Sequence, residues 1–165
     1  MKIGVTLNIN GTDHAVQVEA RRTLADAIRE ECGQTGTHTG CEHGVCGACT
    51  ILLDGEPVRS CLMFAVQAAG RRIRTVEGLA EKESGGEKLH PLQRAFIEHH
   101  GLQCGYCTPG FLMLAAGTLE RNPDVSDGDL KEILSSNLCR CTGYKNIVKA
   151  VRAAAAEMSE RREND

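Results

Sequence analysis

The sequence predicts an α+β chain of two small domains, rich in strands in its first half and helical in its second. Residues 2–8 and 14–19 alternate apolar and polar side chains, which is typical of half-buried strands. From about residue 90 onwards, proline and capping residues precede runs with helical spacing. Between these halves, residues 81–89 are polar, charged and glycine-bearing, which indicates a linker. We therefore expect one domain at 1–80 and a second at 90–165.

The elements of the first half have a recognisable order. Asn10-Gly11 predicts a tight hairpin between the first two strands. Thr23 can cap a helix from residue 24 to about 32, whose apolar face would pack across the sheet. Further strands are expected at 50–53, 57–61 and 71–76. Two strands, a packed helix and then more strands form a β-grasp arrangement of the ferredoxin kind.

The second half predicts a bundle of four helices, at 91–99, 109–119, 129–136 and 146–158. Pro91 begins the first helix, and Gly101 can end it. Thr108, which is followed by a proline, caps the second. Ser126 with Asp129 three residues later resembles a capping box for the third.

Composition narrows the class of protein. The 165 residues include nine cysteines but only two Tyr, three Phe and no Trp, so the core is thin for two domains and bound metal would add stability. The net charge of −3 gives no reason to expect nucleic acid. No apolar run reaches the ~18 residues of a membrane span, and the start lacks the apolar core of a signal peptide. We expect a cytoplasmic protein whose cysteines bind metal and do not form disulfides.

The first cysteine set lies mostly on one short loop. Cys41, Cys46 and Cys49 have the C-x4-C-x2-C spacing of a plant-type [2Fe–2S] site, and Cys61 follows beyond a hairpin. Each iron of such a cluster needs two thiolates, so three ligands would wrap one side and the fourth would arrive from elsewhere. Glycines without a Cβ would let the loop bend and turn N–H groups towards the sulfurs, at Gly40, Gly44 and Gly47.

A second set of four cysteines lies in the helical half: Cys104, Cys107, Cys139 and Cys141. Both pairs fall at predicted helix ends, which would gather four thiolates at one end of the bundle. Helix N-termini at that end favour an anionic group. The ninth cysteine, Cys32, fits neither set and is expected to be a small buried apolar residue.

Cysteines in such patterns also serve other chemistries. Four thiolates can hold zinc, but zinc sites usually pair C-x2–4-C with a distant second pair. The C-x-x-C at 104–107 also occurs in thioredoxin-like proteins, yet the βαβ context is missing. Rieske-type ligation would use His43, His99 or His100, but eight cysteines already supply both sites. The spacing therefore predicts two [2Fe–2S] clusters and electron transfer.

The two motifs with their flanking residues resemble the iron–sulfur subunit, or N-terminal iron–sulfur domain, of the xanthine dehydrogenase/aldehyde oxidase family of molybdenum hydroxylases. The resemblance covers nearly the whole chain and rests on residues 40–49, Cys61, 103–110 and 139–144. Residues 60–67 are also similar to the small subunits of carbon monoxide dehydrogenase and nicotine-type dehydrogenases. The chain length resembles that of the separate small subunit in bacterial heterotrimeric members.

This resemblance implies an electron relay. A large subunit with a molybdopterin cofactor would oxidise the substrate, and a medium subunit would carry FAD, in a heterotrimer or a dimer of heterotrimers. This chain would be the non-catalytic iron–sulfur subunit, with its C-terminal cluster near the molybdenum and its N-terminal cluster nearer the flavin. The residue matching Gln103 would contact the pterin, and the ligand Cys141 would lie against the pterin's amino edge.

The first cysteine loop also bears on the substrate class. Residues 41–46 depart from the form typical of carbon monoxide dehydrogenases, which favours an aldehyde or N-heteroaromatic substrate over carbon monoxide. The alternatives are a stand-alone ferredoxin-like electron carrier and a structural zinc module without a redox role.

Overall fold

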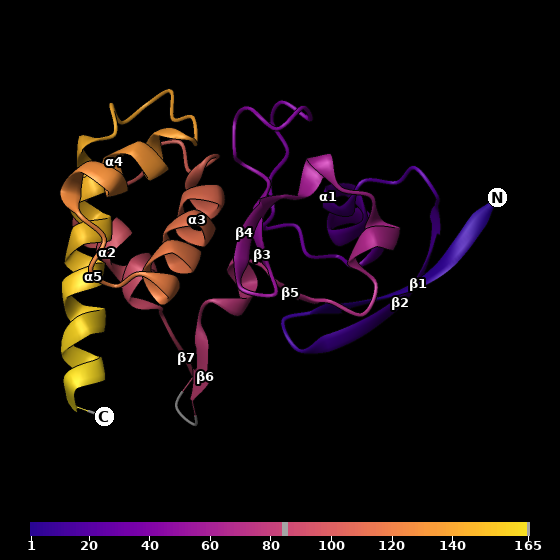
Figure 1. Cartoon of the computed structure of the whole chain (residues 1–165), viewed down its shortest axis with the longest axis horizontal. Helices are drawn as coiled ribbons and strands as arrows, with labels where there is room; N and C mark the ends of the chain where they lie inside the picture. Colours follow the sequence, from indigo (N-terminus) through magenta and orange to yellow (C-terminus); the bar gives the residue numbers. More distant parts are fainter. Residues whose placement is uncertain (84–85, 165) are drawn as a thin grey trace.

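The structure, a computed structural model, describes residues 1–83 and 86–164. Most strands lie at one end of the molecule and most helices at the other, with the N-terminus and C-terminus at opposite ends of its long axis (Figure 1). Residues 84–85 of the predicted linker and Asp165 of the predicted second domain lie outside the described residues.

The first half folds into a five-stranded sheet with the order β2-β1-β5-β3-β4. Its strands are β1 (Lys2–Ile9), β2 (Thr12–Glu19), β3 (Thr50–Leu53), β4 (Glu56–Arg59) and β5 (Arg72–Arg74). β5 runs parallel to β1 and antiparallel to β3, whereas β1–β2 and β3–β4 are antiparallel hairpins. At the first hairpin, Asn10 and Gly11 both take positive φ, of 52° and 81°, as the Asn-Gly signal predicts. The predicted β-grasp arrangement is confirmed.

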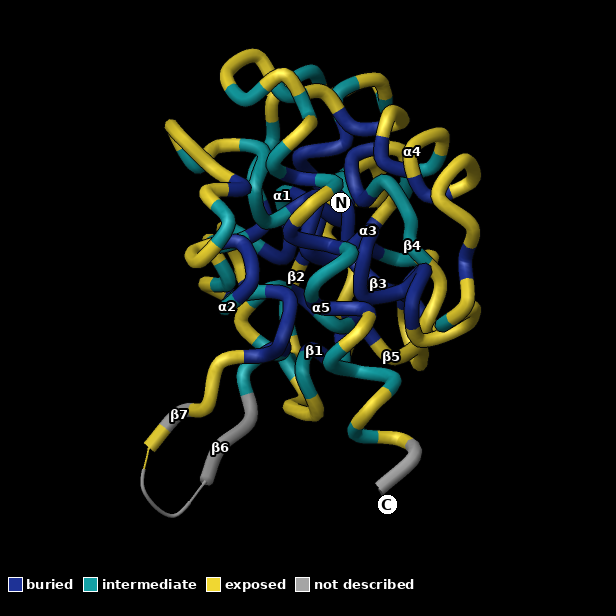
Figure 2. The backbone as a smooth tube through the Cα atoms, turned by 90° about the vertical axis from the view of Figure 1, so that its left-hand side faces the viewer, coloured by how far each residue is buried: buried dark blue, intermediate teal, exposed yellow. Residues whose placement is uncertain are grey.

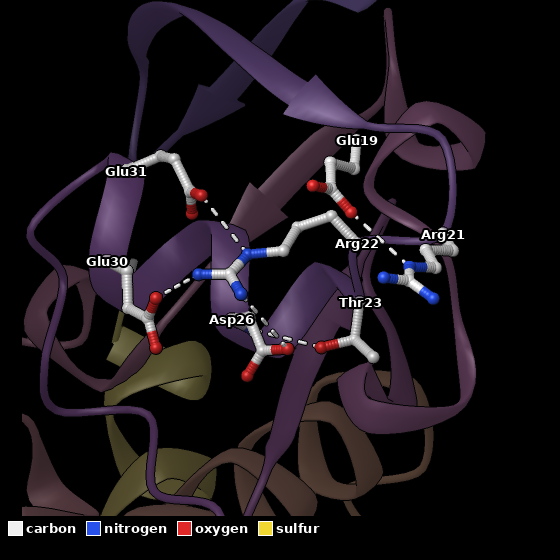
Figure 3. Close-up of polar contacts among 7 residues, drawn as sticks. All are labelled: Glu19, Arg21, Arg22, Thr23, Asp26, Glu30 and Glu31. Carbon is white, nitrogen blue, oxygen red and sulfur yellow. Dashed lines mark hydrogen bonds and ion pairs between the residues drawn. The ribbon is translucent and has the colours of Figure 1, made fainter. Parts of the chain in front are cut away.

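The predicted helix after Thr23 is present, but it changes pitch. α1 (Leu24–Asp26) continues as a π-helical turn, Ala27–Glu31, and the Thr23 hydroxyl accepts a hydrogen bond from the Asp26 N–H at 3.1 Å. Arg22 lies among the carboxylates of Asp26, Glu30 and Glu31 beside this cap (Figure 3). The helix ends at Cys32, which is 9% exposed within the sheet's core, so the prediction of a small buried residue is confirmed.

Between the halves, the predicted linker contains a short hairpin that the sequence did not reveal. β6 (Glu81–Glu83) pairs antiparallel with β7 (Gly86–Lys88). These strands are three residues long and wholly polar apart from a glycine, so they lack the apolar alternation by which a strand is predicted.

The second half contains the four expected helices: α2 (Pro91–Glu98), α3 (Thr108–Arg121), α4 (Asp127–Ser135) and α5 (Lys145–Asn164). At two helix ends, the structure differs from the prediction by one residue. His100, with φ 53°, takes the left-handed position after α2, whereas Gly101 is small because a Cβ there would press on the Phe96 ring at 3.0 Å. The residue before α3 is Cys107, and Thr108 is the first helical residue.

Strand β3 joins the two halves, because its side chains point alternately into the core of each half. All four residues of β3 are buried: Ile51 and Leu53 belong to the core of the sheet, and Leu52 belongs to the core of the helices. α3 packs on β3 and β4, and Figure 1 shows it on the side of the bundle that faces them. Both β3 and α3 lie within the buried interior in Figure 2. The two cysteine loops are thereby fixed relative to each other.

Candidate metal centres

The first cysteine loop turns backbone N–H groups towards its sulfurs. Glu42, Gly44 and Gly47 take positive φ of 56°, 83° and 75°, so the chain curls tightly over residues 41–49. The Cys46 N–H donates to Cys41 Sγ at 3.3 Å. This bond, helped by further N–H groups of the loop, lowers the pKa of the Cys41 thiol to about 6, which favours the thiolate that binds metal.

The glycines predicted to shape the loop have different roles. Gly44 and Gly47 adopt left-handed φ, and Leu62 lies over Gly44, with its Cγ 3.0 Å from where a Cβ would stand. Gly40 does not have positive φ, but a Cβ on it would lie 3.2 Å from Cys46 Sγ. Gly44 and Gly47 therefore allow the loop to bend, whereas Gly40 allows the backbone to approach a cysteine sulfur closely.

Cys49 and Cys61 form the buried half of this site. They are 2% and 8% exposed and pack with Ala25 of α1. Burial, followed by a hydrogen bond with the Cys49 thiol, raises the pKa of Cys61 to about 12. Cys61 lies in a 3₁₀ turn, Ser60–Leu62, directly after β4, so the β3–β4 hairpin returns it to the loop as predicted.

The second set is also arranged in two pairs. Burial, followed by a hydrogen bond with the Cys139 thiol, raises the pKa of Cys107 to about 12. A hydrogen bond with the Cys104 thiol likewise raises the pKa of Cys141. Burial would raise the pKa of Cys139 too, but hydrogen bonds from the Thr142 hydroxyl and N–H outweigh it and lower that pKa.

Each set of four therefore contains two pairs of hydrogen-bonded thiols: Cys41 with Cys46 and Cys49 with Cys61 in the first set, then Cys107 with Cys139 and Cys104 with Cys141 in the second. A [2Fe–2S] cluster takes two thiolates on each of two irons, so this donor set suits it. In the part of the chain that the structure describes, no group of three or more His, Cys, Asp or Glu side chains is arranged to hold a single metal ion.

The two sites differ in exposure. Cys49 and Cys61 are buried, whereas Cys104 and Cys141 are exposed. Gln103, predicted to contact a pterin, is exposed directly beside Cys104. The pair of the second site formed by Cys104 and Cys141 therefore faces outward.

The loops of the two sites touch directly. The Leu138 N–H donates to the Cys46 carbonyl oxygen at 2.9 Å, which connects the residue before Cys139 to the first cysteine loop. Nearby, the Tyr106 hydroxyl donates to the Thr39 carbonyl oxygen at 2.6 Å, and its ring stacks on His38 with centroids 4.9 Å apart. The bond from Leu138 to Cys46 therefore makes the two candidate centres direct neighbours at one junction.

Comparisons with known proteins agree with this geometry. Residues 7–79 match the family described as "2Fe-2S iron-sulfur cluster binding domain", and residues 75–152 match "[2Fe-2S] binding domain". The chain is 51% identical to the nicotine 6-hydroxylase small subunit of Paenarthrobacter nicotinovorans, over 97% of this chain and 94% of that one. It is 53% identical to the caffeine dehydrogenase subunit gamma of Pseudomonas sp. (strain CBB1), over 92% and 90%.

A solved structure shares the whole arrangement. A chain of quinoline 2-oxidoreductase from Pseudomonas putida 86 superposes with a TM-score of 0.90 at 52% identity, over 97% of each chain. The chain belongs to the iron–sulfur small subunits of the xanthine dehydrogenase/aldehyde oxidase family of molybdenum hydroxylases.

Membership of this family answers the alternatives that spacing left open. Both halves match [2Fe–2S] domains, so the zinc and thioredoxin interpretations give way to iron–sulfur chemistry. The three histidines considered as ligands have other contacts or positions. His43 contacts the Cys41 carbonyl oxygen, and His99 and His100 lie at the end of α2. No helix within the described residues is long and apolar enough to cross a membrane.

Two residues of the junction are not predicted from the sequence. Asn137 is 1% exposed between the loops, and the Tyr144 hydroxyl contacts the backbone on both sides of Leu138. The position of Tyr144 in the second motif was the one sequence signal for these residues. A position in a motif does not show which backbone groups the tyrosine hydroxyl will contact.

Proposed function

We propose that this chain carries electrons one at a time between a molybdopterin-binding large subunit and an FAD-binding medium subunit, and is itself non-catalytic. Its ligands would be Cys41, Cys46, Cys49 and Cys61 for one [2Fe–2S] cluster and Cys104, Cys107, Cys139 and Cys141 for the other. Bound [2Fe–2S] clusters supply reversible one-electron transfer. The chain's own residues hold the two sets together and exclude water from the inner thiols.

One observation carries the proposal: the two cysteine loops are joined by the 2.9 Å bond from Leu138 N–H to the Cys46 carbonyl. A chain that only stored metal would not need its two sites in contact, whereas a relay does. The outward pair, Cys104 and Cys141, with Gln103 beside them, supports placing the second site against the molybdopterin subunit. The first site would then face the flavin subunit.

The substrate belongs to the large partner, and the relatives indicate its class. The names of three relatives mention nicotine, caffeine and quinoline, which are all N-heteroaromatic compounds. We infer an N-heteroaromatic substrate ahead of an aldehyde. We also infer a cytoplasmic location, because eight of the nine cysteines are assigned to metal and none forms a disulfide.

The test is a mild purification from the native source, with co-eluting chains identified and Fe, Mo and flavin counted. Two larger chains with molybdenum and FAD, and about four Fe per small chain, are expected for two clusters of two irons each. A single brown protein without molybdenum would overturn the subunit role in favour of a stand-alone carrier. The roles of Gln103 and Cys141 towards a pterin would then be withdrawn.

A further inference from the structure

Asn137 is a buried polar residue where the two halves of the chain meet, between α4 and Cys139. Its carboxamide N–H donates to the Gly47 carbonyl oxygen at 3.3 Å, and its own N–H donates to the Leu134 carbonyl at 3.1 Å. The side chain lies so close to Gly47 that a Cβ there would overlap it. Asn137 therefore holds the first cysteine loop to the end of α4.

The residue after Asn137 makes the contact between the sites. The Leu138 N–H donates to the Cys46 carbonyl oxygen, and Cys139 follows directly. The route from Cys46 to Cys139 thus consists of one carbonyl, one hydrogen bond and the peptide that joins Leu138 to Cys139. Its length depends on how the backbone at 137–139 is held.

Tyr144 holds the same stretch from the other side. Its hydroxyl donates to the Asn137 carbonyl oxygen at 3.0 Å and accepts from the Cys139 N–H at 3.0 Å. The ring packs edge-on against Phe111 of α3, with centroids 6.1 Å apart, so the hydroxyl is directed by the bundle. Leu138 is therefore clamped between two residues whose backbone groups are both fixed.

Stability alone does not explain an asparagine at position 137. Asn137 Oδ1 is buried with no hydrogen-bond partner among the described residues, which lowers the stability of the folded state. An apolar side chain would fill the space without an unmet acceptor. The donor to Gly47 is what the asparagine contributes.

We propose that Asn137 and Tyr144 are positioning residues for electron transfer between the two sites, because together they keep the Leu138 N–H on the Cys46 carbonyl. This inference rests on the proposed function. It adds that the rate of transfer between the clusters depends on two residues that are not ligands.

The experiment compares Asn137→Ala and Tyr144→Phe with the wild type, each purified with its co-eluting chains. Electron equilibration between the clusters after flash reduction is followed by rapid-freeze EPR, and hydrogen exchange of the peptide containing Leu138 is followed by mass spectrometry. Both reduction potentials are measured in the same samples, so that a change in driving force is separated from a change in coupling. Both variants should equilibrate about tenfold more slowly, since ångström displacements cost reactions that much or more, and exchange at Leu138 should rise.

Two matched controls accompany these variants. Tyr106→Phe removes the protein's other tyrosine hydroxyl, which also bridges two loops but does not touch residues 137–139. Thr118→Val removes a buried hydroxyl that, among the described residues, bonds within α3 alone, to the Leu114 carbonyl. Both controls should keep the wild-type rate, even where they lower thermal stability.

The proposal is overturned if Asn137→Ala and Tyr144→Phe keep the wild-type rate, whether or not exchange at Leu138 rises. It is also overturned if Tyr106→Phe slows transfer equally, because any loosening of the loops would then suffice. If Asn137→Ala loses a cluster, Tyr144→Phe decides alone. A wild-type protein without two [2Fe–2S] signals would instead refute the proposed function.

Discussion

Gly110 in the first turn of α3 lies directly against Gly47 of the first cysteine loop. A Cβ on Gly110 would overlap the Gly47 carbonyl oxygen and stand 3.0 Å from Ala48 Cα. Both neighbours are backbone atoms, which cannot rotate away as a side chain can. The helix that begins after Cys107 therefore touches the loop that holds Cys46 and Cys49, with no side chain between them.

Gly110→Ala should consequently separate α3 from the loop and destabilise the protein by about 1–3 kcal/mol, the usual cost of overpacking. A lower thermal midpoint and weaker or broadened EPR signals should follow. The control is Gly128→Ala in α4, where the nearest atom to a Cβ is Ser126 Oγ at 3.9 Å. That change should be neutral or stabilise by about 0.4–1 kcal/mol, because alanine at a position without positive φ reduces the conformational entropy of the unfolded chain. Equal effects of the two changes would contradict the contact.

Single Cys→Ser changes should remove one cluster at a time. Cys104→Ser or Cys139→Ser should abolish the EPR signal of the second site and stop electron flow to the flavin, and leave about two Fe per chain. Cys41→Ser or Cys49→Ser should abolish the other signal. Cys32→Ser is the control, since this buried thiol belongs to the sheet's core, and it should keep both signals. An unchanged two-signal spectrum in Cys139→Ser would disprove the ligand assignment.

Thr23→Ala should weaken the start of α1. The lost bond from the Asp26 N–H to the Thr23 hydroxyl should cost about 1 kcal/mol, the typical value of an N-cap. For a chain of this size, that corresponds to a fall of about 2–4 °C in the thermal midpoint. Thr23→Ser keeps the hydroxyl and should behave like the wild type. If serine and alanine were equally destabilising, packing of the threonine methyl would be the cause and not the cap.

The ion pair between α2 and α5 should make stability depend on pH. The Arg94 guanidinium, which bonds to the Glu157 carboxylate, lowers the pKa of that carboxyl against the opposing effect of burial. A lowered folded-state pKa stabilises above the ordinary glutamate pKa of about 4.3, and the benefit disappears as pH falls through the folded value. Both side chains are about one-third exposed, so Glu157→Gln should cost only about 0.5 kcal/mol at pH 7.

The measurement is the difference in thermal midpoint between wild type and Glu157→Gln at pH 7 and near pH 4. This difference should shrink at the lower pH. Glu132→Gln, at an exposed position on α4, supplies the comparison and should show a smaller difference at pH 7. If the difference in thermal midpoint grew on acidification, the pKa of Glu157 would not be lowered in the folded state.

Much of the fold could be predicted because its signals are local. Asn10-Gly11, Thr23, Pro91 and Ser126 each act on the few residues beside them, and each marks a turn or helix start that the structure contains. The prediction that Gly101 ends α2 is wrong. His100 takes the left-handed position, whereas Gly101 is needed for close packing against Phe96. The β6–β7 hairpin gave no local signal at all.

The candidate ligands were likewise visible in the sequence, because two cysteine sets with this spacing require only counting. What binds the sets together was not visible. The residues that join the loops, Leu138 to Cys46 and Asn137 to Gly47, are 90 or more positions apart, and nothing in their residue types marks them as partners. The pairing of thiols within each set also depends on how the segments meet.

The sequence by itself determined the two kinds of domain, the eight candidate thiolates and the family, since these depend on residue type and spacing along the chain. Only the tertiary structure decided that the two sites touch, which pair faces outward, and that Asn137 and Tyr144 hold the junction. The reason is physical. Spacing along the chain limits which residues can share a loop, but the approach of two loops is set by packing of α3 on β3 and by backbone groups that every residue possesses.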